Sequence, residues 1–126
     1  MKTLIIGAGS GIGQALYRLL PEADSASRQT GYTYQIDVRD AATYPNFTVK
    51  YDRVYYCVGT AADAAEMMDV NAIRSIEFLR HMAPCVKDRG TVMILSSSSG
   101  SIARAVDKLS ASDVHYKMSK AALNMG

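Results

Sequence analysis

The sequence predicts an α/β protein built on a doubly wound parallel sheet with helices on both faces. Apolar runs of strand length alternate with stretches of helical spacing along the chain. The strand runs are almost continuously apolar, which is typical of strands buried on both faces of a parallel sheet. Parallel strands need crossover connections, and these are right-handed in nearly all proteins. With 126 residues and no visible repeat or linker, we expect one domain, residues 1–126.

The elements can be assigned in chain order from these two patterns. A strand is expected at residues 4–7 (LIIG), followed by a helix over residues 12–20 that Pro21 ends. Two short segments separated by Gly31 and polar residues are the next plausible strands, and a continuous β-favouring run follows them. Apolar residues at helical spacing predict one long helix before the last strand. The expected strands are 23–27, 32–36, 53–59 and 91–96; the long helix is about 64–82, and residues 87–90 are expected to turn the chain.

Composition excludes several classes of function. The 14 basic and 12 acidic residues are interspersed, so no basic run predicts a nucleic-acid partner. No apolar run approaches the length of a membrane span, and the N-terminus shows no signal-peptide cleavage pattern, which favours a cytoplasmic protein. Cys57 and Cys85 are too far apart for a metal knuckle, so we expect small buried hydrophobes and no metal site.

A glycine-rich loop, GAGSGIG at residues 7–13, separates the first expected strand from the first expected helix. Gly7, Gly11 and Gly13 allow a tight turn and close approach of a pyrophosphate, whose charge the free N–H groups of the helix start would favour. The alternative is a tight turn without a ligand. The strand before the loop and the helix after it favour a dinucleotide site, to which Gly9, Ser10 and Ile12 would also contribute.

The spacing of this loop, G-x-x-x-G-x-G, resembles that of the short-chain dehydrogenases/reductases. Three further motifs of that family have counterparts in the correct order: Tyr116 and Lys120 match Y-x-x-x-K, Ser97 matches the serine after the fifth strand, and Asn71 matches the asparagine of the preceding helix. The resemblance implies a Rossmann-type sheet and an NADP-dependent carbonyl reductase or alcohol dehydrogenase acting on a small carbonyl or alcohol substrate.

The chemistry of these residue types suits that activity. Tyr116 and Lys120, four residues apart, share one helical face, and a nearby ammonium favours the phenolate of a tyrosine whose pKa is ordinarily about 10. Ser97 would hydrogen-bond the same substrate oxygen, with Ser98 as the alternative. The resemblance implies that Asn71 supports a water and backbone relay to Lys120; the alternative is that Asn71 only caps or kinks its helix.

Cofactor preference depends on the residues that follow the second strand. Ser27 and Arg28 stand there, and an arginine can accept the 2′-phosphate of NADP, so NADP is favoured over NAD. Asp24 would favour NAD if that strand were shorter than expected. The resemblance places Asp37 and Val38 at the adenine. It also places Gly59, Tyr116 and Lys120 among the cofactor contacts.

Two departures from the family pattern modify these expectations. Tyr56-Cys57-Val58-Gly59 replaces Asn-Asn-Ala-Gly, which predicts a less well braced strand end, and an enlarged loop is expected over residues 101–114. The chain also ends six residues after Lys120, inside the helix that follows the fifth strand. The expectation is therefore a C-terminally incomplete domain with little activity. The alternatives are a non-catalytic nucleotide-binding or self-associating remnant, with a homo-oligomer expected, or a plain α/β domain without a ligand.

Overall fold

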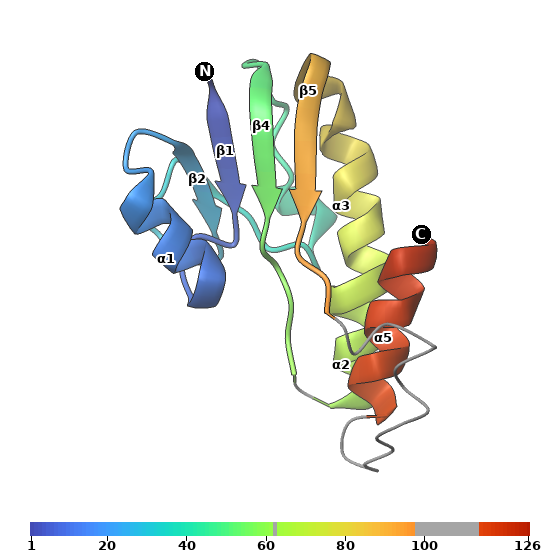
Figure 1. Ribbon diagram of the computed structural model, residues 1–126. Helices are drawn as coiled ribbons and strands as arrows, with labels where there is room; N and C mark the ends of the chain where they lie inside the picture. The colour runs from blue at the N-terminus through green and yellow to red at the C-terminus, as the bar shows by residue number, and fades with distance from the viewer. Residues whose placement is uncertain (62, 98–113) are drawn as a thin grey trace. The chain divides into compact units, whose positions relative to one another are not determined.

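The structure, a computed structural model, describes residues 1–61, 63–97 and 114–126. Its described strands form one five-stranded, entirely parallel sheet in the order β3-β2-β1-β4-β5, and Figure 1 shows β2, β1, β4 and β5 side by side with their arrowheads pointing the same way. The strands are β1 Thr3–Ile6, β2 Asp24–Ser27, β3 Tyr34–Gln35, β4 Tyr51–Tyr56 and β5 Val86–Ile94. The predicted Rossmann-type parallel α/β sheet is confirmed.

The chain divides into two compact units, each described here by itself. The first unit comprises Met1–Val58 and Phe78–Leu95 and contains the whole sheet. The second comprises Gly59–Glu77 and the described residues from Ser96 to Gly126.

Helix α1, Gly11–Leu19, packs against the sheet of the first unit as its helical spacing predicts. Leu16 and Leu20 contact a buried cluster that includes Ile5, the middle apolar residue of β1. Aromatic side chains form a second cluster of the unit, in which the rings of Tyr56 and Phe78 stack with centroids 6.1 Å apart. Burial of such residues is the main favourable contribution to the stability of this unit.

Strand β4 begins and ends earlier than the predicted range of 53–59. Tyr51 belongs to it because its backbone pairs with Val86 of β5; its ring is fully buried and its hydroxyl donates a 2.6 Å hydrogen bond to the carboxylate of Asp24. The polar residue Asp52, between Tyr51 and the predicted range, hid this start from a pattern based on continuous β-favouring residues. Strand β3 is also shorter than predicted, with two residues instead of five.

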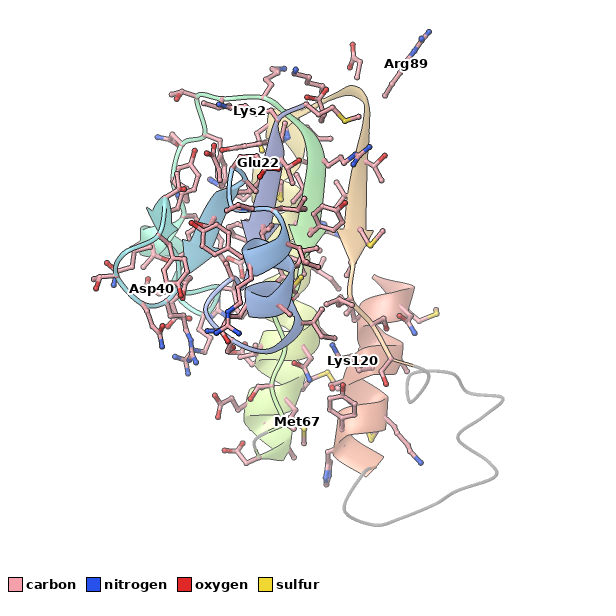
Figure 2. All side chains as sticks on the ribbon, turned by 60° about the vertical axis from the view of Figure 1, so that its left-hand side comes forward. Lys2, Glu22, Asp40, Met67, Arg89 and Lys120 are labelled. Atoms are coloured by element: carbon pink, nitrogen blue, oxygen red, sulfur yellow. The ribbon has the colours of Figure 1, made fainter. Side chains whose placement is uncertain are left out.

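The expected turn at residues 87–90 is wrong, because these residues belong to β5. The strand is irregular there: its register against β4 shifts between Tyr51 and Arg53, and Arg89 takes a left-handed conformation with φ 65°. Figure 2 shows the Arg89 side chain pointing away from the ribbon. A bulge of this kind contains turn-favouring residues, which the sequence pattern detects, but it does not end the strand.

The helix predicted over residues 64–82 forms, but it has an unexpected interruption. It comprises α2 Ala64–Met68, the π-helical segment η2 Asp69–Arg74 and α3 Ser75–Met82, of which the last five residues belong to the first unit. Asp63 caps α2 by accepting a 3.0 Å hydrogen bond from the Glu66 backbone N–H. Inside the second unit, Ser75 donates a 2.6 Å hydrogen bond to the carbonyl of Val70 and so satisfies a backbone group near the interruption.

Helix α5, Val114–Met125, carries the Tyr116 motif, and two short 3-10 turns lie at Ala41–Thr43 and Ala83–Cys85. The expected enlarged loop over residues 101–114 lies almost wholly outside the described residues. Within the described part of the chain, no helix is both long and apolar enough to cross a membrane.

Candidate functional site

The glycine loop between β1 and α1 turns tightly at Gly7 and Gly11 and leaves no room for a side chain at Gly13. Gly7 and Gly11 take positive φ values of 86° and 56°, which favour glycine. A Cβ added to Gly13 would lie 2.0 Å from the carbonyl oxygen of Gly7. The first turn of α1 therefore lies directly against the loop.

Ser27 closes the other side of the loop at the end of β2. A Cβ added to Gly9 would lie 2.4 Å from the Ser27 hydroxyl oxygen, which accepts a 3.1 Å hydrogen bond from the backbone N–H of Gln29. Ser10, the residue before α1, makes no side-chain cap to that helix, and the first turn carries no acidic residue. The backbone N–H groups at the helix start therefore suit an anion such as a pyrophosphate.

The two candidates for selecting the cofactor, Asp24 and Arg28, lie at opposite ends of β2. Asp24 is the first residue of β2, and its carboxylate accepts the hydrogen bond from Tyr51, so it does not follow the strand. Arg28 immediately follows β2 and its side chain is exposed. The interpretation that favoured Asp24 required a strand shorter than predicted, and β2 extends to Ser27.

Asp37 and Val38 follow β3, as expected. Two side-chain nitrogens of Arg39 donate to the Asp37 carboxylate, the shorter bond being 2.9 Å, and this contact lowers the pKa of Asp37. The backbone N–H of Asp37 is held by the hydroxyl of Thr43 at 3.0 Å. Val38 is buried. These contacts therefore fix the segment that follows β3, which was expected to contact the adenine.

In the second unit, Asn71 lies in the π-helical segment and is fully buried. Its side-chain oxygen accepts a 2.7 Å hydrogen bond from the Thr60 N–H, and its side-chain nitrogen donates to the Thr60 carbonyl at 2.8 Å. The amide therefore binds the loop after β4 and does not cap its own helix.

Gly59 lets the same loop approach Lys120 closely. A Cβ at Gly59 would lie 3.3 Å from the Lys120 nitrogen and 3.4 Å from the Asn71 side-chain oxygen. The first distance is shorter than ordinary van der Waals contact and the second is at its lower limit, so a larger residue would press on the lysine. Three predicted residues that are far apart in sequence, Gly59, Asn71 and Lys120, therefore meet in the second unit.

Tyr116 and Lys120 lie one turn apart on α5, with the Lys120 nitrogen 5.8 Å from the centroid of the Tyr116 ring. The Lys120 side chain is only 4% exposed, and burial lowers its pKa. Among the described residues, no carboxylate lies within ion-pair distance of it. Figure 2 shows the labelled Lys120 on α5. A buried cation beside a phenol without a carboxylate is typical of functional sites.

Ser97 follows β5 and is half-buried, whereas its alternative, Ser98, lies outside the described residues. His81 and His115 are exposed. Of the two cysteines expected to be buried, Cys85 is buried, whereas Cys57 is half-buried with its pKa raised by burial. The Cys57 backbone lies 3.0 Å from a Cβ built on Gly7, so this cysteine packs against the glycine loop.

Sequence reasoning missed Thr60 and Ser119. Thr60 binds Asn71 through its backbone alone, so its side chain gave no signal. Ser119 is fully buried and contacts the Asn71 amide. Its position between Tyr116 and Lys120 was visible, but the π-helical segment that brings Asn71 to it was not.

Comparisons with solved structures show the same fold. A carbonyl reductase from Pseudomonas aeruginosa PAO1 matches with a TM-score of 0.81 and 23% identity over 99% of this chain and 71% of that chain. The same enzyme in complex with NADP also matches with a TM-score of 0.81, over 99% of this chain and 73% of that chain. The protein lin1944 from Listeria innocua matches with a TM-score of 0.81 and 16% identity, over 99% of this chain and 67% of that chain.

The chain thus has the fold of the short-chain dehydrogenases and carbonyl reductases, and it spans about 70% of the length of these neighbours. No family model matches the sequence, and no curated protein matches it.

Proposed function

We propose that the chain is a nicotinamide-dependent oxidoreductase of the short-chain dehydrogenase/reductase type, which interconverts a small carbonyl compound and its alcohol. The observation that carries the proposal is the pair formed by Tyr116 and Lys120. Lys120 is buried without a carboxylate partner among the described residues, and its nitrogen lies beside the ring of Tyr116. Burying an ammonium group without a paired carboxylate costs free energy, and a purely structural role would not require that cost.

The glycine loop fits the pyrophosphate of a dinucleotide. The positions of Gly9 and Gly13 admit no side chain, and the start of α1 presents N–H groups that Ser10 does not cap. Arg28 would pair with the 2′-phosphate of NADP, while Asp37 and Val38 would lie at the adenine. The neighbouring carbonyl reductase that was solved in complex with NADP supports this choice of cofactor. When bound, the cofactor would supply or accept the hydride.

The chain's own residues would manage the proton. Tyr116 would donate its hydroxyl proton to the oxygen of the carbonyl compound, and Ser97 would hydrogen-bond the same oxygen. Lys120 would favour the phenolate through its charge and bind the ribose hydroxyls. Asn71 would hold the loop of Gly59 and Thr60 against Lys120, the part of the expected relay that its hydrogen bonds support.

The test is NADPH oxidation with a panel of aldehydes and ketones, comparing the chain with Tyr116→Phe. Removing the proton donor should lower turnover by about 10²-fold or more, because general acid catalysis contributes about 10²–10⁴-fold. Tyr32→Phe, a half-buried tyrosine of the first unit, is the matched control and should keep full turnover. A Tyr116→Phe protein as active as the unmodified chain would contradict the proposal.

A second candidate is a nucleotide-binding protein with little turnover that associates with itself. The observation that favours it is the apolar surface of β5, at one end of the strand order, where Val92, Met93 and Ile94 are 39%, 54% and 43% exposed. Exposed apolar residues on an end strand favour pairing with another copy. Tight NADPH binding by calorimetry without detectable oxidation of any substrate would support this candidate over the reductase.

A further inference from the structure

Ser119 is a buried hydroxyl that the predicted motifs do not include. It lies on α5 between Tyr116 and Lys120, and its side chain is fully buried. Its oxygen lies 2.7 Å from the carbonyl of Tyr116 and 3.1 Å from the side-chain nitrogen of Asn71. Both neighbours belong to the second unit, and both are assigned functional roles in the proposed function.

The direction of each hydrogen bond follows from the groups involved. The Tyr116 carbonyl can only accept, so the single hydroxyl proton of Ser119 is donated to it. The lone pairs of Ser119 then accept from the Asn71 amide nitrogen. This arrangement also agrees with Thr60, whose N–H requires the amide oxygen and whose carbonyl requires the amide nitrogen.

Ser119 therefore completes the hydrogen bonds of a fully buried amide. Asn71 has two side-chain N–H donors, of which one binds the Thr60 carbonyl and the other binds Ser119. Without the Ser119 hydroxyl the second donor is left unpaired in a buried place, which destabilises this arrangement. The amide would then be free to turn, and its contact with Thr60 would weaken.

We propose that Ser119 is a positioning residue, which ties the amide of Asn71 to α5 and thereby holds Lys120 against the loop of Gly59 and Thr60. The helix needs such a tie because its 12 residues are about the length at which isolated helices are marginal in water. The catalytic consequence rests on the proposed function, whereas the structural tie does not.

The experiment compares Ser119→Ala with Ser75→Ala in the chain without cofactor. Ser75 is a matched control: it is also fully buried in the second unit and donates to a backbone carbonyl, that of Val70, whereas the two side-chain N–H groups of Asn71 donate to Thr60 and Ser119. NMR gives two readouts: hydrogen exchange of the Asn71 side-chain amide, and a pH titration of Lys120 labelled with ¹³C at Cε. Lys120→Met assigns the lysine signal.

Ser119→Ala should speed exchange of the Asn71 amide by about 10-fold or more, because an unpaired donor loses a net hydrogen bond of about 1.5 kcal/mol. It should also raise the pKa of Lys120 toward that of an ordinary lysine, since a loosened helix lets water reach the ammonium. Burial lowers the pKa of Lys120, and Tyr116 is the titratable group that contacts it. Ser75→Ala should move neither readout.

Ser119→Cys keeps the buried volume but hydrogen-bonds weakly, so it provides the same comparison if the alanine variant fails to fold. The proposal is overturned if the variant at Ser119 leaves the Lys120 titration unchanged, even with faster Asn71 exchange, because Ser119 would then only satisfy the amide. It is also overturned if Ser75→Ala moves both readouts equally. In the reductase assay, kcat should fall about 10-fold with KM for NADPH unchanged. Complete absence of reductase activity would refute the proposed function and leave the NMR comparison decisive.

Discussion

Replacing Gly13 by alanine should destabilise the chain and weaken NADPH binding, although alanine is the better helix former. At an unconstrained position inside a helix this change stabilises by about 1 kcal/mol. Here the new Cβ would lie 2.0 Å from the Gly7 oxygen, 2.8 Å from the Gly7 carbonyl carbon and 3.1 Å from the Cys57 Cβ. Real Cβ atoms essentially never approach within 3.0 Å, so the loop must move by about 1 Å.

A displacement of this kind reverses the sign of the usual effect. Forcing an extra methyl group into a packed site costs about 1–3 kcal/mol, so we expect Gly13→Ala to lower the free energy of unfolding by that amount. The moved Gly7 belongs to the loop that we propose binds the pyrophosphate, so the Kd for NADPH should rise about 10-fold or more.

Urea unfolding and calorimetric titration with NADPH measure the two effects. Gln14→Ala, the next residue of α1 and only partly buried, is the control and should change stability by no more than about 0.5 kcal/mol. A Gly13→Ala protein as stable as the unmodified chain, with the same Kd, would refute the close-approach argument.

Three further changes test other parts of the structure. Arg28→Ala should weaken NADP(H) binding about 10-fold or more and leave NAD(H) unchanged, as measured by titration with both; equal loss for both cofactors would contradict the 2′-phosphate role. Burial lowers the pKa of Lys120 in the folded state, so folding should become more favourable as pH rises from that lowered pKa toward the ordinary value of 10.5. Lys120→Met should therefore be more stable than the unmodified chain near pH 7, with a gain that shrinks toward pH 10.5 in urea unfolding; a constant difference would contradict it. Met93→Glu should shift a self-associated sample toward monomer in sedimentation, whereas an unmodified chain that is already monomeric would count against association through β5.

The sequence by itself determined the alternation of strands and helices, because burial imposes local periodicities that can be counted along the chain. It also determined the loop of Gly7, Gly11 and Gly13. Positive φ values and close backbone approaches exclude most side chains, so glycine at these positions is visible in the sequence. The spacing of Tyr116 and Lys120 predicted a shared helical face for the same local reason, and the ring and the ammonium do lie together.

Only the tertiary structure decided which distant residues meet. The π-helical segment at Asn71 carries no glycine or proline that would announce it, and it places the amide where both Thr60 and Ser119 can bind it. Likewise, the Tyr51 hydroxyl at the start of β4 binds the carboxylate of Asp24, a residue 27 positions away. Hydrogen bonds between segments so far apart leave no periodic pattern, because their energy depends on positions in space and not on neighbours along the chain.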